Sequence, residues 1–324
     1  MTRKKLLLIL PRNERGFWGK VTNGKAGFVR LSLPALAAIT PSDWDVAIHD
    51  TRKDPLHFDA PADLVGITSF TAEIPSAYAI ADSYRERGIP VVMGGVHVSA
   101  LPDEALNHAD SVVVGEAEFV WRQLLKDFEA GSLKKVYKSD NYCTMEHMKI
   151  PRRDLIEREM YVSCFNTIQA TRGCPFDCDY CSVTGVFGRT FRKRPVAEVI
   201  EEITCFDGSD FFFVDDNICG HLPYAKELFR NLIPLKKSWG AQTSITFARD
   251  DEMLDLYARS GGRYAFIGFE TISETNLETI NKKWNAPSKY GDTIQKIHDA
   301  GINILGSFIF GLDVDSENVF EDTL

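Results

Sequence analysis

The sequence lacks any long hydrophobic run. Its first apolar stretch covers only residues 6–10 and is followed by Pro11-Arg12-Asn13. A membrane-spanning helix needs about 18 apolar residues, and the apolar core of a secretory signal peptide takes roughly 7–15. We therefore expect no transmembrane segment and no signal peptide, and we predict that residues 6–10 form a buried strand of a cytoplasmic protein.

The sequence also lacks an excess of positive charge. Its 37 Lys and Arg residues face 46 Asp and Glu residues, which gives a formal net charge of −9. Nucleic-acid binding rests largely on cationic contacts to phosphates, so the composition argues against a nucleic-acid partner. Hydrophobic residues make up 44% of the 324 residues. That is ample for two cores, and a chain of this length predicts two domains.

Cysteine is scarce, and the seven cysteines form an odd set. A chain of this size needs no disulfide framework, and in the cytoplasm its thiols are expected to stay reduced. Three of them lie close together, where Cys174, Cys178 and Cys181 follow the spacing Cys-x-x-x-Cys-x-x-Cys. This cysteine loop is the strongest chemical signal in the sequence.

Three thiolates on one short loop can hold three irons of a [4Fe–4S] cluster. The fourth iron is then free to bind a substrate or a cofactor. A structural zinc site needs four ligands. The other cysteines nearest to the loop stand outside ordinary zinc spacings (Cys164, Cys205 and Cys219). The spacing therefore predicts an open-site cluster on the three cysteines of the loop.

Residues 1–130 alternate short apolar runs with amphipathic stretches, which predicts an α/β fold with a parallel sheet. The expected strands cover residues 6–10, 45–49, 64–68, 90–93 and 111–114. Ligands of such sheets bind beyond the carboxyl ends of the strands. The third strand runs into Ser69-Phe70-Thr71 and the fourth into Gly94-Gly95-Val96-His97, where glycine lets the backbone approach a ligand closely. By itself, the Gly-Gly pair fits a tight turn equally well.

The βα alternation resumes at residue 164, after a stretch of mixed polarity at 131–163 that we interpret as a linker. The expected strands there cover residues 168–171, 211–214, 244–247, 264–269 and 303–310. Repeated βα units predict a TIM-like barrel, in which functional residues collect at the carboxyl ends of the strands. The chain stops soon after the strand at 303–310, so we expect a partial barrel without its C-terminal part. Its open strand edge should be prone to association.

The cysteine loop resembles that of the radical S-adenosylmethionine (SAM) enzymes, in which the residue before the third cysteine is aromatic. Here that residue is Tyr180. The resemblance implies that Tyr180 helps to bind the adenine, and that the amino and carboxylate groups of SAM chelate the free iron. One electron from the cluster would then cleave SAM to methionine and a 5′-deoxyadenosyl radical. A donor such as flavodoxin or ferredoxin is implied as the electron source.

The same resemblance assigns several strand ends to SAM. Besides Tyr180, the residues expected to contact SAM are Asp215, Asp216, Asn217, Ser244, Glu270 and Gly306. The first three take the place of the family's Gly-Gly-Glu element, which contacts the SAM amino group, although Asp-Asp-Asn is also common in turns. Glu270 could accept hydrogen bonds from the ribose, and Gly306 resembles the glycine against which adenine packs. Gln242 and Arg249, with Ser244, could bind SAM or substrate.

The N-terminal half resembles the Rossmann-like cobalamin-binding domain that precedes many radical SAM modules. In that domain a small hydroxyl residue follows the third strand and a Gly-Gly pair follows the fourth. The matching residues here are Ser69, Thr71, Gly94 and Gly95. Cobalamin mutases carry Asp-x-His-x-x-Gly after the second strand, and its histidine ligates cobalt. Here Asp50 fits the first position, but Arg52 replaces the histidine and Pro55 the glycine. The resemblance implies cobalamin without that lower ligand.

Across almost the whole chain, the resemblance is to cobalamin-binding radical SAM enzymes, in particular the subgroup that includes hopanoid C-2 methylases. It implies a cobalamin-binding domain at 1–130, a linker at 131–163 and a radical SAM core at 164–324. The implied activity is a cobalamin-dependent methyltransferase acting on an unactivated carbon of a small-molecule or lipid substrate. A cyclase or ring-rearranging enzyme of the same family is the alternative. A cobalamin or redox sensor is disfavoured, because a sensor needs no SAM pocket.

Overall fold

The computed structural model describes residues 3–13, 26–52, 56–58, 60–164 and 166–324. The chain divides into two compact units, each considered by itself below. The first comprises Met1–Thr144 and Met148–Phe165, and the second comprises Met145–His147 and Asn166–Leu324. Within the described ranges, no helix combines the length and the apolar character needed to cross a bilayer.

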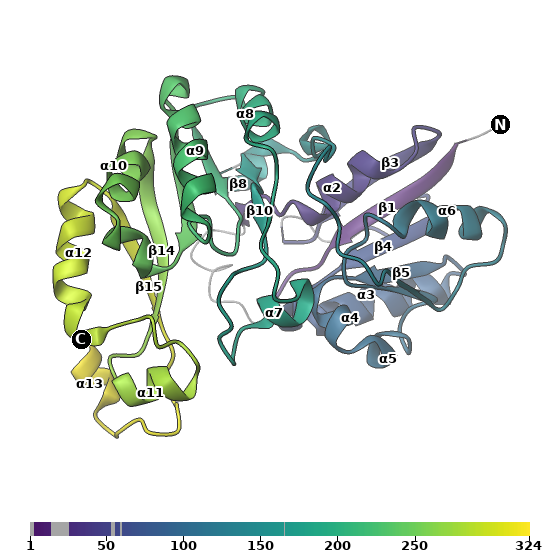
Figure 1. Ribbon diagram of the computed structural model, residues 1–324. Coiled ribbons are helices and arrows are strands. Elements are labelled where there is room, and N and C mark those ends of the chain that lie inside the picture. The colour runs from purple at the N-terminus through teal and green to yellow at the C-terminus, as the bar shows by residue number, and fades with distance from the viewer. Residues whose placement is uncertain (1–2, 14–25, 53–55, 59, 165) are drawn as a thin grey trace. The chain divides into compact units, whose positions relative to one another are not determined.

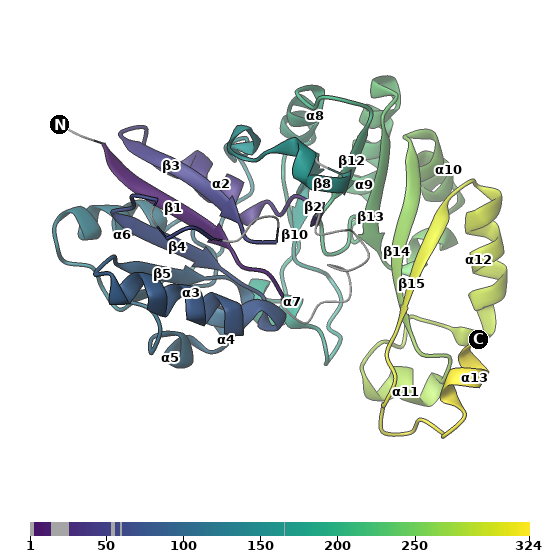
Figure 2. The ribbon, with the colours of Figure 1, turned by 180° about the vertical axis from the view of Figure 1, so that it is seen from behind.

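The first unit is built on a parallel sheet with the strand order β3-β1-β4-β5-β6-β7 over its described residues (Figures 1 and 2). The strands are β1 (Lys4–Leu10), β3 (Trp44–Asp50), β4 (Leu64–Thr68), β5 (Val91–Gly94), β6 (Ser111–Val114) and β7 (Val136–Lys138). The longer helices are α2 (Ser32–Ile39), α3 (Ile74–Glu86) and α6 (Trp121–Glu129), and the shorter ones are α4 (Val96–Ala100) and α5 (Pro102–Ala105). A short strand β2 (Ala26–Phe28) pairs in parallel with β8 (Tyr161–Cys164).

Both faces of this first sheet are buried, which explains why its strands read as continuous apolar runs. Along β1, Leu7 and Ile9 join one apolar cluster, which includes residues of α3. Leu6 and Leu8 join the opposite cluster, which includes residues of α2 and α6. Alternate side chains of a strand point to opposite faces, so one strand contributes to two cores.

The second unit carries a parallel sheet whose strands follow one another in chain order. They are β9 (Thr167–Ile168), β12 (Asp210–Phe213), β13 (Ser238–Thr243), β14 (Gly262–Glu270) and β15 (Asn303–Phe308). The helices between and after them are α7 (Ser182–Phe187), α8 (Val196–Thr204), α9 (Leu222–Leu232), α10 (Asp251–Arg259), α11 (Glu274–Thr279), α12 (Tyr290–Asp299) and α13 (Val319–Thr323). Sequential parallel strands with outer helices form the wall of a βα barrel. The predicted α/β class is thus confirmed in both units.

An aromatic cluster fixes β12 and β13 against α9 and α10. The ring of Trp239 lies 5.3 Å from that of Phe213, 4.9 Å from that of Phe229 and 4.4 Å from that of Tyr257, measured between centroids. All four side chains are fully buried. Aromatic pairs at such distances add about 0.5–1.5 kcal/mol each beyond the burial of their area. This packing holds β12 and β13, whose carboxyl ends carry residues of the candidate site, in place against α9 and α10.

Three expected strands of the second unit need correction. The strand expected at 244–247 is wrong, because the extended chain is β13 and residues Ile245–Arg249 form a 3₁₀ helix. Ser244 caps that helix by accepting a hydrogen bond from the amide of Thr246. The strand expected at 303–310 ends at Phe308. The strand expected at 168–171 is split, since β9 ends at Ile168 and Thr171–Arg172 form β10, which pairs antiparallel with β11 (Arg192–Lys193).

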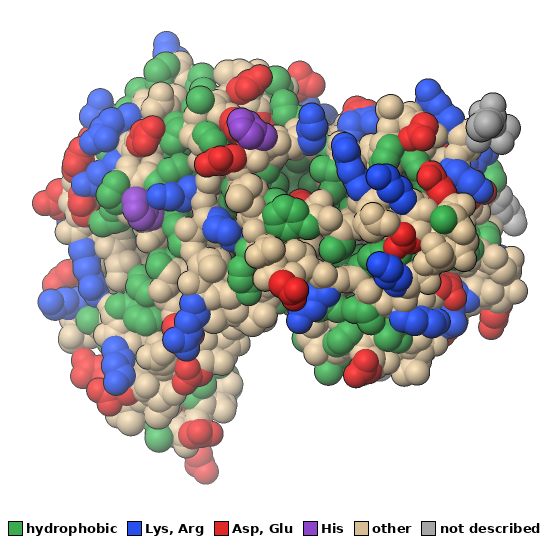
Figure 3. Space-filling view, turned by 45° about the vertical axis from the view of Figure 1, so that its right-hand side comes forward, with side chains coloured by type: hydrophobic (Ala, Val, Ile, Leu, Met, Phe, Trp, Pro, Cys, Tyr) green, Lys and Arg blue, Asp and Glu red, His purple; other side chains and the backbone are tan. Residues whose placement is uncertain are grey.

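Charged side chains are spread over the surface. Figure 3 shows acidic and basic groups interspersed over the visible face of the described residues. The formal net charge of −9 is therefore not gathered into one broad acidic field on that face.

Candidate functional site

The cysteine loop connects β10 to α7. Cys174, Cys178 and Cys181 are all partly exposed, and Cys181 is the residue immediately before α7. Among the residues that the structure describes, no three or more His, Cys, Asp or Glu side chains could hold a metal ion as they stand. As a donor set, three accessible thiols on one loop fit an iron–sulfur cluster with one open iron.

The backbone just before Cys174 is held by two carboxylates from the end of β12. We call residues 169–173 the lead-in segment. Asp215 is completely buried and accepts hydrogen bonds from the amides of Ala170 (3.1 Å) and Thr171 and from the Thr171 hydroxyl (2.6 Å). Asp216 accepts a 3.0 Å hydrogen bond from the amide of Gly173. Burial raises the pKa of Asp215 to about 7, against the hydrogen bonds that favour its anion.

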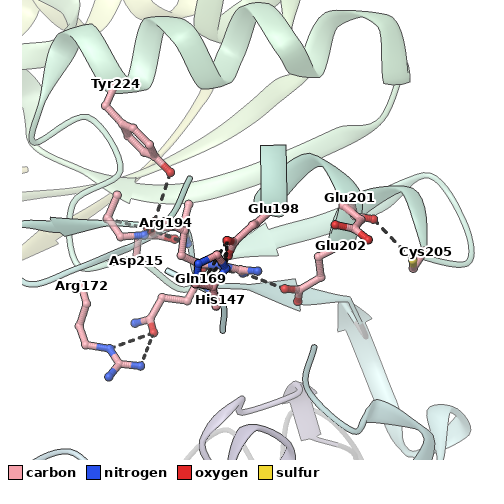
Figure 4. A network of polar contacts seen from close by, with 12 residues as sticks. His147, Gln169, Arg172, Arg194, Glu198, Glu201, Glu202, Cys205, Asp215 and Tyr224 are labelled. Carbon is pink, nitrogen blue, oxygen red and sulfur yellow. Dashed lines mark hydrogen bonds and ion pairs between the residues drawn. The ribbon is translucent and has the colours of Figure 1, made fainter. Parts of the chain in front are cut away.

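Further side chains hold the carbonyl groups of the lead-in segment (Figure 4). The backbone amide of Arg194 donates to the carbonyl of Ala170 (2.9 Å), and its guanidinium donates to that of Gln169 (3.1 Å). Arg194 also forms a 2.7 Å ion pair with Glu202, and both side chains are buried. The hydroxyl of Tyr224 donates a 3.3 Å hydrogen bond to the Ala170 carbonyl. The segment is thus fixed from α8, α9 and β12 together.

Asn217 joins the first cysteine to the end of β13. Its amide nitrogen donates to the sulfur of Cys174 at 3.8 Å. Its side-chain oxygen accepts hydrogen bonds from the Thr243 hydroxyl (3.5 Å) and from the amide of Ser244 (3.4 Å). The structure therefore brings Asn217 and Ser244, both predicted site residues, to the same place.

The second half of the cysteine loop contacts the end of β14 and the turn after α11. Tyr180 donates a 2.8 Å hydrogen bond to Glu270, and Lys282 donates to Glu270 (2.6 Å) and to the Tyr180 hydroxyl (3.1 Å). Glu270 and Lys282 are both buried. Burial, followed by the carboxylate of Glu270, raises the pKa of Tyr180 above its ordinary value. Glu270 has a φ of 66°, a left-handed conformation that a side chain rarely adopts.

Two more contacts anchor this half of the loop. The ring of Phe176 stacks on that of Trp284, with centroids 4.1 Å apart and planes 14° apart. The side chain of Asn281 donates a 2.6 Å hydrogen bond to the carbonyl of Asp177. Sequence reasoning missed Lys282, Asn281 and Trp284, because each lies in a polar turn more than ninety residues from the loop it touches.

The remaining predicted SAM residue, Gly306, lies on β15 beside Ile267 of β14. A side chain at this position would lie 3.1 Å from the ring of Phe269. Nearby, the guanidinium of Arg249 donates to the carbonyl of Trp284. The structure thus brings Tyr180 together with Glu270, and Cys174 with Asn217 and Ser244. Gly306 makes no polar contact with either group.

In the first unit, the predicted cobalamin residues meet at the carboxyl ends of β4 and β5. The amide of Ser69 donates to the carbonyl of Gly94 (3.3 Å). The hydroxyl of Ser69 is buried and has no hydrogen-bond partner among the residues that the structure describes. Gly95 has a φ of 102°, and a side chain there would lie 2.8 Å from both the Ser69 carbonyl oxygen and the Thr68 hydroxyl. An orphaned buried hydroxyl beside a glycine cradle fits a ligand that approaches the backbone closely.

Thr71 belongs to a polar chain beside this edge. Its hydroxyl lies 3.1 Å from Nδ1 of His97, and Nε2 of His97 lies 3.3 Å from Glu104. Tyr78 donates a 2.9 Å hydrogen bond to the same carboxylate. His97 is buried and engaged at both ring nitrogens, so its present partners are Thr71 and Glu104.

Arg52, which stands where the cobalt-ligating histidine occurs in cobalamin mutases, is fully engaged. Its guanidinium donates to both oxygens of Asp50, at 2.6–3.2 Å. Tyr161 adds a 2.8 Å hydrogen bond to Asp50. Burial acts to raise the pKa of Asp50, but the hydrogen bonds and charge of Arg52 outweigh it, and the pKa lies below its ordinary value. A guanidinium has no free electron pair to give to a metal.

Comparison with family models gives two matches. Residues 168–324 match the model of the radical SAM superfamily, and residues 30–125 match that of the B12 binding domain. The first match begins six residues before Cys174 and contains the whole cysteine loop. The second contains Ser69, Thr71, Gly94 and Gly95.

Among curated proteins, the bacteriochlorophyllide d C-12(1)-methyltransferase of Chlorobaculum tepidum is 34% identical, over 99% of this chain and 72% of its own length. The hopanoid C-2 methylase of Rhodopseudomonas palustris is 27% identical, over 99% of this chain and 64% of its own. Among solved structures, the cobalamin-dependent SAM radical enzyme OxsB with aqua-cobalamin bound superposes with a TM-score of 0.76. It is 16% identical, over 95% of this chain and 49% of OxsB.

Proposed function

We propose that this chain, which belongs to the family of cobalamin-binding radical SAM enzymes, is a methyltransferase that acts on an unactivated carbon of a small-molecule or lipid substrate. The observation that carries the proposal is the presence of both sites in one chain. In the second unit, the cysteine loop follows β9 and β10 and is held by hydrogen bonds to other strand ends. In the first unit, Gly95 and the hydroxyl of Ser69, which is unbonded among the described residues, lie at the carboxyl ends of β5 and β4. The names of the two relatives, a methyltransferase and a methylase, favour methyl transfer.

When bound, the cluster and SAM supply a radical that removes a hydrogen atom from carbon, and cobalamin supplies a methyl group. Cys174, Cys178 and Cys181 would hold the cluster. Tyr180 would lie along the adenine, and Glu270 would accept hydrogen bonds from the ribose. The protein's own work is to hold these groups in register and to exclude water from them.

The other SAM residues are proposed on their place in the structure. Asn217 lies beside Cys174 and is itself bonded by the amide of Ser244, and we place the methionine end of SAM there. Gly306 lies against the buried ring of Phe269, where a side chain would be crowded, and we propose on the resemblance that adenine packs along this stretch of β15. Lys282 pairs with Glu270, and it would therefore place a positive charge beside Glu270, where the ribose is proposed to bind.

The cobalamin residues are proposed on the same basis. The Ser69 hydroxyl would gain the hydrogen bond that it lacks among the described residues. Gly94 and Gly95 would let the ligand approach the backbone, and Thr71 would contact it beside His97. Since Arg52 is held by Asp50, we propose that cobalt receives no lower ligand from that position.

We further propose that the protein works in the cytoplasm and receives its electron from a flavodoxin or ferredoxin. The three loop cysteines must stay reduced to ligate iron, and a reducing compartment keeps them so. Reduction by purified flavodoxin, followed as SAM cleavage, tests the electron source directly.

A substrate-free experiment tests methyl transfer. The full chain is reconstituted anaerobically with iron, sulfide and cobalamin, the cobalamin is reduced, and SAM carrying a deuterated methyl group is added. We expect the label to appear on the bound cobalamin by mass spectrometry. A variant with Gly95→Trp should lose it, whereas Gly88→Trp, at a positive-φ glycine that precedes β5 and has open space around it, should retain it.

The alternative is a cyclase or ring-rearranging enzyme of the same family. Such an enzyme would cleave SAM to 5′-deoxyadenosine without moving its methyl group to cobalamin. Cleavage with no label on cobalamin would therefore replace the methyltransferase by this alternative. Cobalamin binding without any SAM cleavage would instead favour a sensor.

A further inference from the structure

The geometry points to Asp215 and Asp216 as positioning residues for the cysteine loop: their carboxylates fix the lead-in segment and thereby the place where Cys174 begins the motif. The inference rests on the proposed function only for what the loop binds. The contacts themselves belong to the chain, and they give these two residues a task that does not depend on contact with SAM.

The lead-in segment leaves the sheet after β9, so its backbone needs other partners. Buried backbone amides and carbonyls in native proteins are almost always paired. Here the amides of Ala170 and Thr171 bond to Asp215, and that of Gly173 bonds to Asp216. Carboxylates therefore bond to these amides in addition to the pairing of Thr171 and Arg172 with β11.

The character of these bonds suits a positioning role. Hydrogen bonds to a charged acceptor are shorter and stronger than those between neutral groups. Asp215 has no exposed surface, so its carboxylate is shielded from any ligand. It also accepts the Thr171 hydroxyl at 2.6 Å, which fixes the side chain of the segment as well as its backbone.

Gly173, the residue directly before Cys174, completes the arrangement. It has a φ of 86°, and a side chain there would lie 2.1 Å from the carbonyl oxygen of Thr190. Two backbone segments approach so closely that only glycine fits between them. Asp216 holds the amide of this glycine, so a shift of the carboxylate would be passed directly to Cys174.

The competing explanation is that Asp215 and Asp216 stabilise the fold as a whole. The two roles differ in where a variant loosens the molecule. A positioning role predicts loosening confined to the lead-in segment and Cys174. A general role predicts loosening of the neighbouring strand β13 to the same degree.

The test uses the full chain without cluster, reduced and anaerobic. Asp216→Asn, Asp215→Asn and Thr171→Val are compared with Asp210→Asn, which makes the same change at the exposed start of β12. Amide hydrogen exchange is measured over residues 169–173 and over β13. The rate of iodoacetamide labelling is measured at Cys174, with the exposed Cys205 as the internal reference.

We expect exchange over 169–173 and labelling of Cys174 to rise roughly tenfold in the first three variants. The Asn variants keep an oxygen that can accept a hydrogen bond but lose the charged acceptor, and Thr171→Val loses the hydroxyl that bonds to Asp215. Exchange in β13 and labelling of Cys205 should stay unchanged, as should all rates in Asp210→Asn. If Asp215→Asn fails to fold, Asp216→Asn and Thr171→Val decide the matter.

Equal rises over 169–173 and β13 would overturn the inference, as would unchanged rates in both Asp216→Asn and Thr171→Val. Neither outcome bears on methyl transfer, which is measured separately on the loaded protein. Conversely, absence of methyl transfer in the wild-type protein would leave these exchange and labelling results standing.

Discussion

The hydroxyl of Tyr180 lies 2.8 Å from the carboxylate of Glu270, which follows it by 90 residues in the chain. This hydrogen bond joins the cysteine loop to the end of β14. It also unites the two residues for which the resemblance implied contact with opposite ends of one nucleoside, adenine and ribose. The predictions below concern the cysteine loop first, then its contacts, and then the first unit.

Removing any one loop cysteine should abolish the cluster. Anaerobically reconstituted wild-type protein should bind about four irons and four sulfides per chain. Cys174→Ala, Cys178→Ala and Cys181→Ala should each lose the iron-dependent absorbance. Cys205→Ala is the matched control, since Cys205 is exposed and lies at the end of α8. Stoichiometric zinc without iron in the wild-type protein would contradict the cluster.

Neutralising Glu270 should weaken SAM binding while leaving the iron content intact. Glu270→Gln replaces a charged acceptor by a neutral one, and hydrogen bonds to charged groups are worth about 1.5–3 kcal/mol. We expect the dissociation constant for SAM, measured by equilibrium dialysis, to rise roughly tenfold. Glu274→Gln, an exposed glutamate in the first turn of α11, should change nothing. Equal affinity in both variants would remove Glu270 from the SAM site.

Removing Lys282 should destabilise the protein more than removing both members of its ion pair. Lys282→Met leaves the carboxylate of Glu270 buried without its 2.6 Å partner, and breaking such a pair costs about 3–5 kcal/mol. The double variant Lys282→Met/Glu270→Gln leaves no unpaired charge, so it should recover part of that free energy of unfolding. The measurement is a denaturant titration of all four proteins of the cycle. Strictly additive losses would show that the two groups do not interact.

Closing the glycine cradle should block cobalamin. Gly95→Ala places a methyl group 2.8 Å from the Ser69 carbonyl oxygen and the Thr68 hydroxyl, and it also forces a side chain into a positive φ, which costs roughly 1–3 kcal/mol. Gly88→Ala, before the start of β5, carries the same kind of backbone strain, with a φ of 73°, but meets no atom within 4 Å. We expect cobalamin uptake, followed by absorbance, to fall in Gly95→Ala only. Equal uptake would move the ligand elsewhere.

The ion pair between Asp50 and Arg52 should appear in the pH dependence of stability. The pKa of Asp50 is lowered in the folded protein from 3.8. Its ionisation therefore contributes stability that is present above pH 3.8 and is lost as the pH falls through the folded pKa. Asp50→Asn should be less stable than wild type at pH 7, and the difference should shrink below about pH 4. Asp45→Asn, on the exposed face of the same strand, is the control.

Much of the fold can be predicted from the sequence. The five apolar strands predicted for the first unit are found within one or two residues of their expected bounds, because strands buried on both faces give unbroken apolar runs. The sixth strand, β7, lies in the stretch that we interpreted as a linker. The strand expected at 244–247 fails for a local reason. Ser244 caps a helical turn instead of extending the sheet, and the apolar residues after it pack from that turn.

The contacts that hold the cysteine loop in place are harder to predict from the sequence. The position of the Asp-Asp-Asn run predicts contact with SAM, but it does not predict that Asp215 bonds to residues 44 and 45 positions earlier. Lys282 looks like any lysine of a polar turn until the fold brings it 102 residues back to Tyr180. Contacts between residues so far apart in the sequence arise from tertiary packing, and residue spacing in the sequence does not predict them.

The dependence of the cysteine loop on Asp215 also sets an order of events during synthesis. The ribosome adds Cys174 to the chain well before Asp215. The amide of Thr171 can therefore form its hydrogen bond only after Asp215, 44 residues further along, has been added. The ligands of the cluster therefore take their final places only after β12 has been made and has joined the sheet. Iron and sulfide delivered earlier would meet three thiols on a chain whose lead-in segment still lacks the hydrogen bonds to Asp215.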